Sequence, residues 1–83
     1  MDISTFEGLW EHAKIQRPND IVFIRIIGEH GSYVYATSYE FYKGSKEFVT
    51  LYRRDFRNNV DIPVAMLNLN DIDNIYSPWA ESE

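Results

Sequence analysis

The sequence predicts an α+β fold, in which an N-terminal amphipathic helix packs on a curved antiparallel sheet of three to five strands. A small open barrel is the alternative form of that sheet. One helical apolar stripe comes first in the 83-residue chain, apolar runs of strand length follow it, and short turns separate these runs. Because 45% of the residues are hydrophobic and the chain is short, we predict a single domain over residues 1–76 and a short, flexible acidic tail over residues 77–83.

The pattern over residues 4–16 is typical of the amphipathic helix. Ser4 and Glu7 have the spacing of a capping box, in which two side chains satisfy free backbone N–H groups at the start of a helix. Pro18 is expected to end the helix, because a residue that precedes proline avoids the helical conformation. One face carries apolar side chains at positions i, i+3, i+4 and i+7, namely Phe6, Leu9, Trp10 and Ala13.

Four strands are expected after the helix, over residues 20–28, 33–42, 47–53 and 60–69. The first is apolar on both faces except at Arg25, which is typical of a central strand. In the fourth, Pro63 indicates an edge or a bulge because proline has no N–H group for the ladder. Residues 70–76 are expected to form a turn or short helix capped by its own Asn or Asp, whose Ile72 and Ile75 return to the core.

Aromatic side chains are the most informative feature, because 16% of the residues are Phe, Trp or Tyr. Side-chain alternation in the second strand predicts one stripe of Tyr33, Tyr35, Thr37, Tyr39 and Phe41. Either this stripe packs across a half-covered sheet, or it is a binding surface, for which the apolar ring and polar hydroxyl of tyrosine are suited. Trp79 in the tail either folds onto the core or anchors a partner.

Charge is unevenly distributed along a chain whose net charge is −5. A basic strip within residues 43–57 comprises Lys43, Lys46, Arg53, Arg54 and Arg57. Residues 58–83 carry acidic side chains and no basic ones, and three of these acids fall in the predicted domain: Asp61, Asp71 and Asp73. The basic strip would suit phosphate and the acids would suit a basic partner, but ordinary surface charge is the favoured explanation of both.

The sequence contains no pattern that indicates catalysis or metal binding. The chain has no cysteine, which excludes thiol catalysis and cysteine-ligated metals. His12 and His30 have no nucleophile or orienting acid in a catalytic spacing, and no glycine-rich phosphate loop is present. We therefore predict that the protein is not an enzyme and uses no cofactor and no metal. No apolar run approaches the roughly 20 residues of a membrane helix, so no membrane partner and a cytoplasmic location are expected.

The favoured hypothesis is a small acidic protein that occludes the surface of a larger protein, as an inhibitor or adaptor. By analogy, such proteins in viruses and mobile elements block nucleic-acid-handling machines, as anti-CRISPR and anti-restriction proteins do. Tyr33, Tyr35 and Tyr39 would then supply apolar contact while the acidic side chains imitate phosphates. The alternatives are a homo-oligomeric accessory protein, such as a homodimer, and a binder of single-stranded nucleic acid through the basic strip. The negative net charge argues against nucleic acid.

Overall fold

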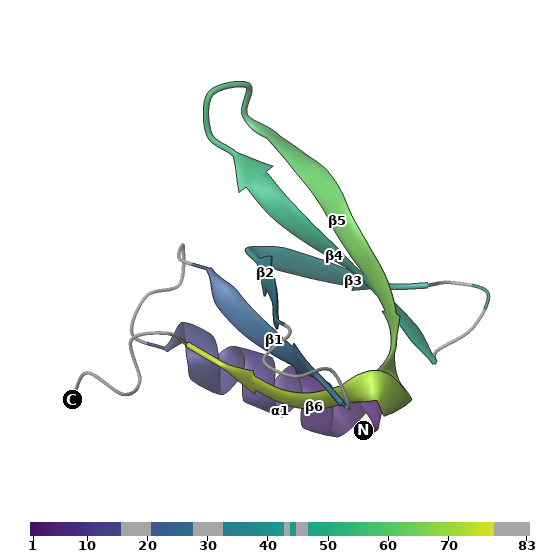
Figure 1. The fold of residues 1–83 in the computed structure, drawn as a ribbon. Coiled ribbons are helices and arrows are strands. Elements are labelled where there is room, and N and C mark those ends of the chain that lie inside the picture. The colour runs from purple at the N-terminus through teal and green to yellow at the C-terminus, as the bar shows by residue number, and fades with distance from the viewer. Residues whose placement is uncertain (16–20, 28–32, 43, 45–46, 78–83) are drawn as a thin grey trace.

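The computed structural model describes residues 1–15, 21–27, 33–42, 44 and 47–77, and these form one helix and two three-stranded antiparallel sheets (Figure 1). The predicted α+β class is confirmed, and the two sheets are not closed into a barrel. The elements are α1 (Ile3–Lys14), β1 (Val22–Ile26), β2 (Tyr33–Ala36), β3 (Ser38–Phe41), β4 (Phe48–Asp55), β5 (Val60–Asn68), the 3₁₀ helix η1 (Leu69–Asp71) and β6 (Ile72–Tyr76).

The helix α1 begins earlier than the sequence pattern predicts, because Asp2 caps it. The Thr5 backbone N–H donates to Asp2 Oδ1 at 2.7 Å, and this hydrogen bonding lowers the pKa of the Asp2 carboxyl. Ser4 lies inside the helix, so the predicted capping box was wrong. The helix ends at Lys14, and Pro18 lies outside the described residues.

The apolar stripe of α1 packs on the sheets as an amphipathic helix, as predicted, although the structure has two sheets where one was expected. Phe6 is fully buried, and its ring meets the rings of Tyr39 and Phe41 edge-on at centroid distances of 4.9 and 5.5 Å. Ile72 and Ile75 are buried, which confirms their predicted return to the core. The buried core of the described residues comprises Phe6, Trp10, Val22, Ile24, Ala36, Val49, Leu51, Leu69, Ile72 and Ile75.

The strand predicted over residues 33–42 is divided at Thr37, where the chain passes from one sheet to the other. β2 pairs with β1 in the sheet of order β2-β1-β6, whereas β3 pairs with β4 in the sheet of order β3-β4-β5. The corner is held by the Thr37 hydroxyl, which accepts from the Arg54 N–H at 2.8 Å and donates to the Tyr52 carbonyl at 3.3 Å. The Thr37 N–H also donates to that carbonyl, at 2.8 Å.

This corner divides into two parts the single aromatic stripe that side-chain alternation predicts for a continuous strand. In β2 the buried side chain is Ala36, so Tyr33 and Tyr35 point to the opposite, exposed face. After Thr37 the alternation is reset, and Tyr39 and Phe41 pack toward α1. The prediction of one continuous stripe was therefore wrong: its first half is a surface and its second half lines the core.

Replacing Thr37 with valine tests the role of the corner. The variant keeps the shape of the side chain but leaves the Arg54 N–H without its acceptor in a partly buried position. We expect the free energy of unfolding to fall by about 1–3 kcal/mol, since an unsatisfied donor loses its hydration as well as its bond. Urea unfolding measures this. Thr37→Ser, which keeps the hydroxyl, serves as the control, and equal stability of the two variants would contradict this account of the corner.

The hairpin of β4 and β5 extends beyond the core as an arm, defined here as residues 52–64 (Figure 1). β4 continues to Asp55, so the loop predicted from residue 54 begins later than expected. β5 lies at the edge of its sheet and the register shifts opposite Pro63, which agrees with both options predicted for that proline.

Residues 70–76 prove to be the end of η1 followed by β6, and the capping side chain is Asn68, whose Oδ1 accepts from the Asn70 N–H at 2.9 Å.

Hydrogen bonds to one carboxylate organise the turn at the tip of the arm. Asp55 Oδ2 accepts from Asn58 Nδ2 at 2.8 Å, and Asp55 Oδ1 accepts from the Arg57 N–H at 3.0 Å. These bonds lower the pKa of Asp55, with the side chain of Asn58 as the largest cause. Asn59 completes the turn with a positive φ of 56°, a conformation that asparagine tolerates.

The lowered pKa of Asp55 predicts how stability depends on pH. A carboxyl whose folded-state pKa lies below its unfolded value stabilises the fold above the unfolded value, near 3.8, and loses that effect as the pH falls through the lower folded-state pKa. Asp55→Asn should therefore be less stable than the unaltered chain at pH 6, and the difference should be smaller at about pH 3. Denaturant midpoints at both pH values measure this, and a difference that is equal at both would contradict the assignment.

Candidate protein-interaction surface

The sheet of β2, β1 and β6 carries a cluster of aromatic side chains on the face opposite the core. We call it the tyrosine face, and it consists of Phe23, Tyr33, Tyr35 and Tyr76. Phe23 alternates with the buried residues on either side of it in β1, so its ring points away from them. Its centroid lies 4.7 Å from that of Tyr35, 5.6 Å from that of Tyr76 and 5.9 Å from that of Tyr33. The tyrosine face is therefore one contiguous cluster with Phe23 at its centre.

The pairing register of the strands sets the positions of these rings in the free chain. Phe23 lies directly across from Tyr35 of β2 and from Tyr76 of β6, so the three rings are cross-strand neighbours. Tyr33 and Tyr35 remain 41% and 42% exposed, whereas Phe23 and Tyr76 are half-buried beneath and beside them. Rings held on paired strands lose little conformational entropy on binding, which favours their use as contact residues.

Charged side chains border the tyrosine face on two sides. Arg53 reaches across from β4, where its Nη2 donates to the Tyr35 carbonyl at 3.3 Å and its guanidinium carbon lies 5.6 Å from the centre of the Tyr35 ring. On the other side, Arg25 Nε lies 3.5 Å from Asp73 Oδ2, and both side chains are half-exposed. Such an exposed ion pair contributes little to stability. Arginine beside tyrosine is, however, the composition that protein interfaces favour.

Of the three tyrosines predicted to bind a partner, the structure brings Tyr33 and Tyr35 together and places Tyr39 elsewhere. The Tyr39 ring packs against Trp10 and Phe6 at centroid distances of 4.8 and 4.9 Å. Burial raises the pKa of the Tyr39 hydroxyl, and the carboxylates of Glu7 and Glu11 raise it further. Tyr39 is thus part of the contact between α1 and β3 and lies apart from the tyrosine face.

The predicted acidic residues do not form a single patch. Asp61 lies on β5, where Arg54 Nη1 is 3.3 Å from its Oδ1. Asp73 lies on β6 beside the tyrosine face, in its ion pair with Arg25. Asp71 is exposed in η1, and its carbonyl accepts from the Ile27 N–H at 2.8 Å. Trp79 lies outside the described residues.

The predicted basic strip is likewise divided. Lys43 and Lys46 lie outside the described residues. Arg53 contacts Tyr35, and Arg54 donates both to Asp61 and to the side chain of Asn59. Arg57 is exposed in the turn at the tip of the arm. Of the arginines in the predicted strip, Arg53 therefore contacts β2 and Arg54 contacts residues of the arm, and a continuous track for phosphates is not apparent among them.

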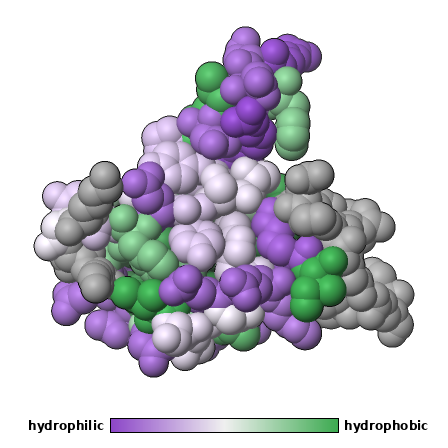
Figure 2. Space-filling model, turned by 180° about the vertical axis from the view of Figure 1, so that it is seen from behind, coloured by the Kyte–Doolittle hydropathy of each residue, from purple (hydrophilic) through white to green (hydrophobic). Residues whose placement is uncertain are grey.

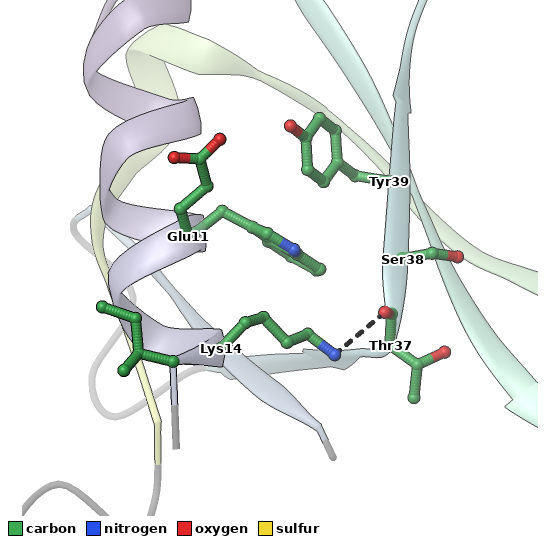
Figure 3. A pocket seen from close by; sticks show the side chains of 7 residues that line it. Glu11, Lys14, Thr37, Ser38 and Tyr39 are labelled. Atoms are coloured by element: carbon green, nitrogen blue, oxygen red, sulfur yellow. Dashed lines mark hydrogen bonds between the residues drawn. The ribbon is translucent and has the colours of Figure 1, made fainter. Parts of the chain in front are cut away.

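A groove of about 390 Å³ lies between the C-terminal half of α1 and the corner at Thr37 (Figure 3). Lys14 Nζ donates to the Thr37 carbonyl at 3.1 Å and lies 5.5 Å from the centre of the Trp10 ring. Figure 3 shows Glu11 and Tyr39 turned toward the same space from α1 and β3. The lysine in this groove thus ties α1 to the corner between the sheets.

Sequence reasoning missed three contributors to the surface: Phe23, Tyr76 and Arg25. The available signal was the apolar character of both faces of β1, because a residue that alternates with buried neighbours must point away from the core. The pairing of β1 with β6, which brings Tyr76 against Phe23, is a long-range contact that no local pattern encodes.

The described residues show two further negative results. No group of three or more His, Asp or Glu side chains among them could hold a metal ion. Their one long helix, α1, has 12 residues, and none of the described helices is long and apolar enough to cross a membrane.

No protein-family model, curated protein or solved structure matches the chain.

Proposed function

We propose that the protein binds a larger protein through the tyrosine face and acts by occluding the surface that it covers, as an inhibitor or adaptor. The observation that carries this proposal is the ordered, exposed ring cluster centred on Phe23. Aromatic side chains that stay exposed in a contiguous cluster on a sheet are a feature of interaction sites, and tyrosine and arginine are enriched among the residues that dominate binding energy.

The surroundings of the tyrosine face suit such a contact. Tyr33 and Tyr35 supply apolar area with hydroxyl groups that can form hydrogen bonds to a partner. Arg53 on one side and the Arg25–Asp73 pair on the other would form the polar rim that surrounds the apolar centre of an interface. We assign the protein to the cytoplasm and take machines that handle nucleic acids, including those that viruses and mobile elements counteract, as the class of partner to examine first.

Affinity capture from the native host with matched variants tests the proposal. The double variant Tyr33→Ser, Tyr35→Ser removes the exposed rings of the face. The control Tyr42→Ser removes a tyrosine that is 52% exposed and lies outside the face. We expect one protein to be captured by the unaltered chain and by the control, and to be lost with the double variant while circular dichroism shows that the variant is folded. Equal capture by all three chains would contradict the proposal.

A further inference from the structure

Apart from the tyrosine face, the molecule presents a second apolar surface, along β5. β5 is nine residues long and pairs on one side only, with β4, so none of the described strands pairs with its outer edge. Its exposed apolar side chains are Val60 at 48%, Ile62 at 47%, Val64 at 37% and Met66 at 55%. A long apolar edge strand is a template for pairing with a further strand, and proteins ordinarily protect such edges with charge.

The arm that carries most of β5 is seen from behind in Figure 2. The arm stands clear of the body, and hydrophobic side chains lie on both of its flanks among hydrophilic ones. The body below it shows side chains of intermediate hydropathy, with hydrophobic ones in separate places. In this view another chain can therefore approach the arm from both of its flanks.

The distribution of charge indicates what kind of chain could pair with the edge of β5. Asp61 is the one ionisable side chain between Val60 and Asn68, and Arg54 of the same arm lies 3.3 Å from it. The arm as a whole carries three arginines and two aspartates, whereas the chain has a net charge of −5. At β5, two copies meet through nearly neutral edges, so the net charge of −5 causes little repulsion at this contact.

We propose that a second copy of the chain pairs with β5, edge to edge about a two-fold axis. An apolar edge is complementary to itself, and an isologous contact of this kind closes at two copies instead of growing into a fibre. The strand is about 30 Å long, so pairing along it covers an area at the lower end of the range for specific interfaces. Pro63 and the bulge opposite it interrupt the edge, which limits the number of backbone hydrogen bonds between the copies. We therefore infer a dimer in exchange with monomer, which leaves both tyrosine faces free.

The test is the mass of the full chain in solution, measured by sedimentation equilibrium from about 10 µM to about 1 mM, a range that covers weak interfaces. We expect the mass to rise from 9.8 kDa toward twice that value. Ile62→Lys should raise the dimer dissociation constant at least tenfold, whereas Ile27→Lys, at an isoleucine that is 54% exposed directly after β1, should leave it within about twofold. Circular dichroism verifies that both variants are folded.

Two results would overturn the inference. One is a mass of 9.8 kDa at every concentration of the unaltered chain. The other is a dimer that survives Ile62→Lys but is lost in the Tyr33→Ser, Tyr35→Ser variant, which would place the contact on the tyrosine face. The capture experiment measures the binding of a larger partner separately from the mass of the free chain, so failure of this inference and failure of the proposed function are distinguishable.

Discussion

Replacing Phe6 with alanine is expected to lower the free energy of unfolding by about 3–5 kcal/mol, the usual cost of removing a buried phenylalanine ring. Phe6 is fully buried and contacts three other rings, of Trp10, Tyr39 and Phe41. These residues come from α1 and β3, so the substitution leaves a cavity where the helix meets the second sheet. Domains of this size are stabilised by only about 5–15 kcal/mol, so the loss is a large share of the total.

Urea unfolding followed by circular dichroism measures this change, and the chain offers a matched control. Phe56 is 73% exposed in the turn of the arm, so Phe56→Ala should alter the free energy of unfolding by less than about 0.5 kcal/mol. Equal effects of the two substitutions would mean that α1 does not pack as the structure shows.

Replacing Phe23 with alanine is expected to have the second large effect, on partner binding. The ring of Phe23 supports the exposed rings of Tyr33 and Tyr35, and without it they lose their neighbour and their fixed positions. We expect the dissociation constant for the captured partner to rise at least tenfold, equivalent to about 1.4 kcal/mol. Stability should also fall, by about 2 kcal/mol, less than for a fully buried ring because Phe23 is only half-buried.

Titration calorimetry with the purified partner, below the unfolding temperature of the variant, separates the two effects. Phe23→Leu keeps most of the apolar volume beneath the tyrosines and should raise the dissociation constant by less than about threefold. An alanine variant that is folded and binds as tightly as the unaltered chain would show that the tyrosine face is not the binding surface.

Local patterns predicted the helix and the core residues well, because these depend on periodicity. The stripe from Phe6 to Trp10 is set by the helical repeat. Ile72 and Ile75 have the spacing of a helical turn, and both are buried in β6 because the pairing of β6 with β1 shifts register at this point. The start of α1 was mispredicted because Asp2 and Ser4 are both good capping residues, and nothing local decides between them.

The tyrosine face was predicted only in part, because its geometry depends on the corner at Thr37 between β2 and β3. Alternation assumes an unbroken strand, and the hydrogen bonds that divide it at Thr37 come from Tyr52 and Arg54, more than a dozen residues further along the chain. The sequence therefore indicated tyrosines on a strand, but could not separate Tyr35, which is exposed, from Tyr39, which packs against α1.

Nitration of tyrosine in the free chain and in the captured complex tests the central claim most directly, with peptide mass spectrometry to locate the modified rings. In the free chain, Tyr33, Tyr35 and Tyr42 should react readily, since each is more than 40% exposed, and Tyr39 should react slowly. In the complex, Tyr33 and Tyr35 should be protected while Tyr42 reacts as before. Equal reactivity of Tyr33 and Tyr35 in the free and bound states would contradict the claim that the partner covers the tyrosine face.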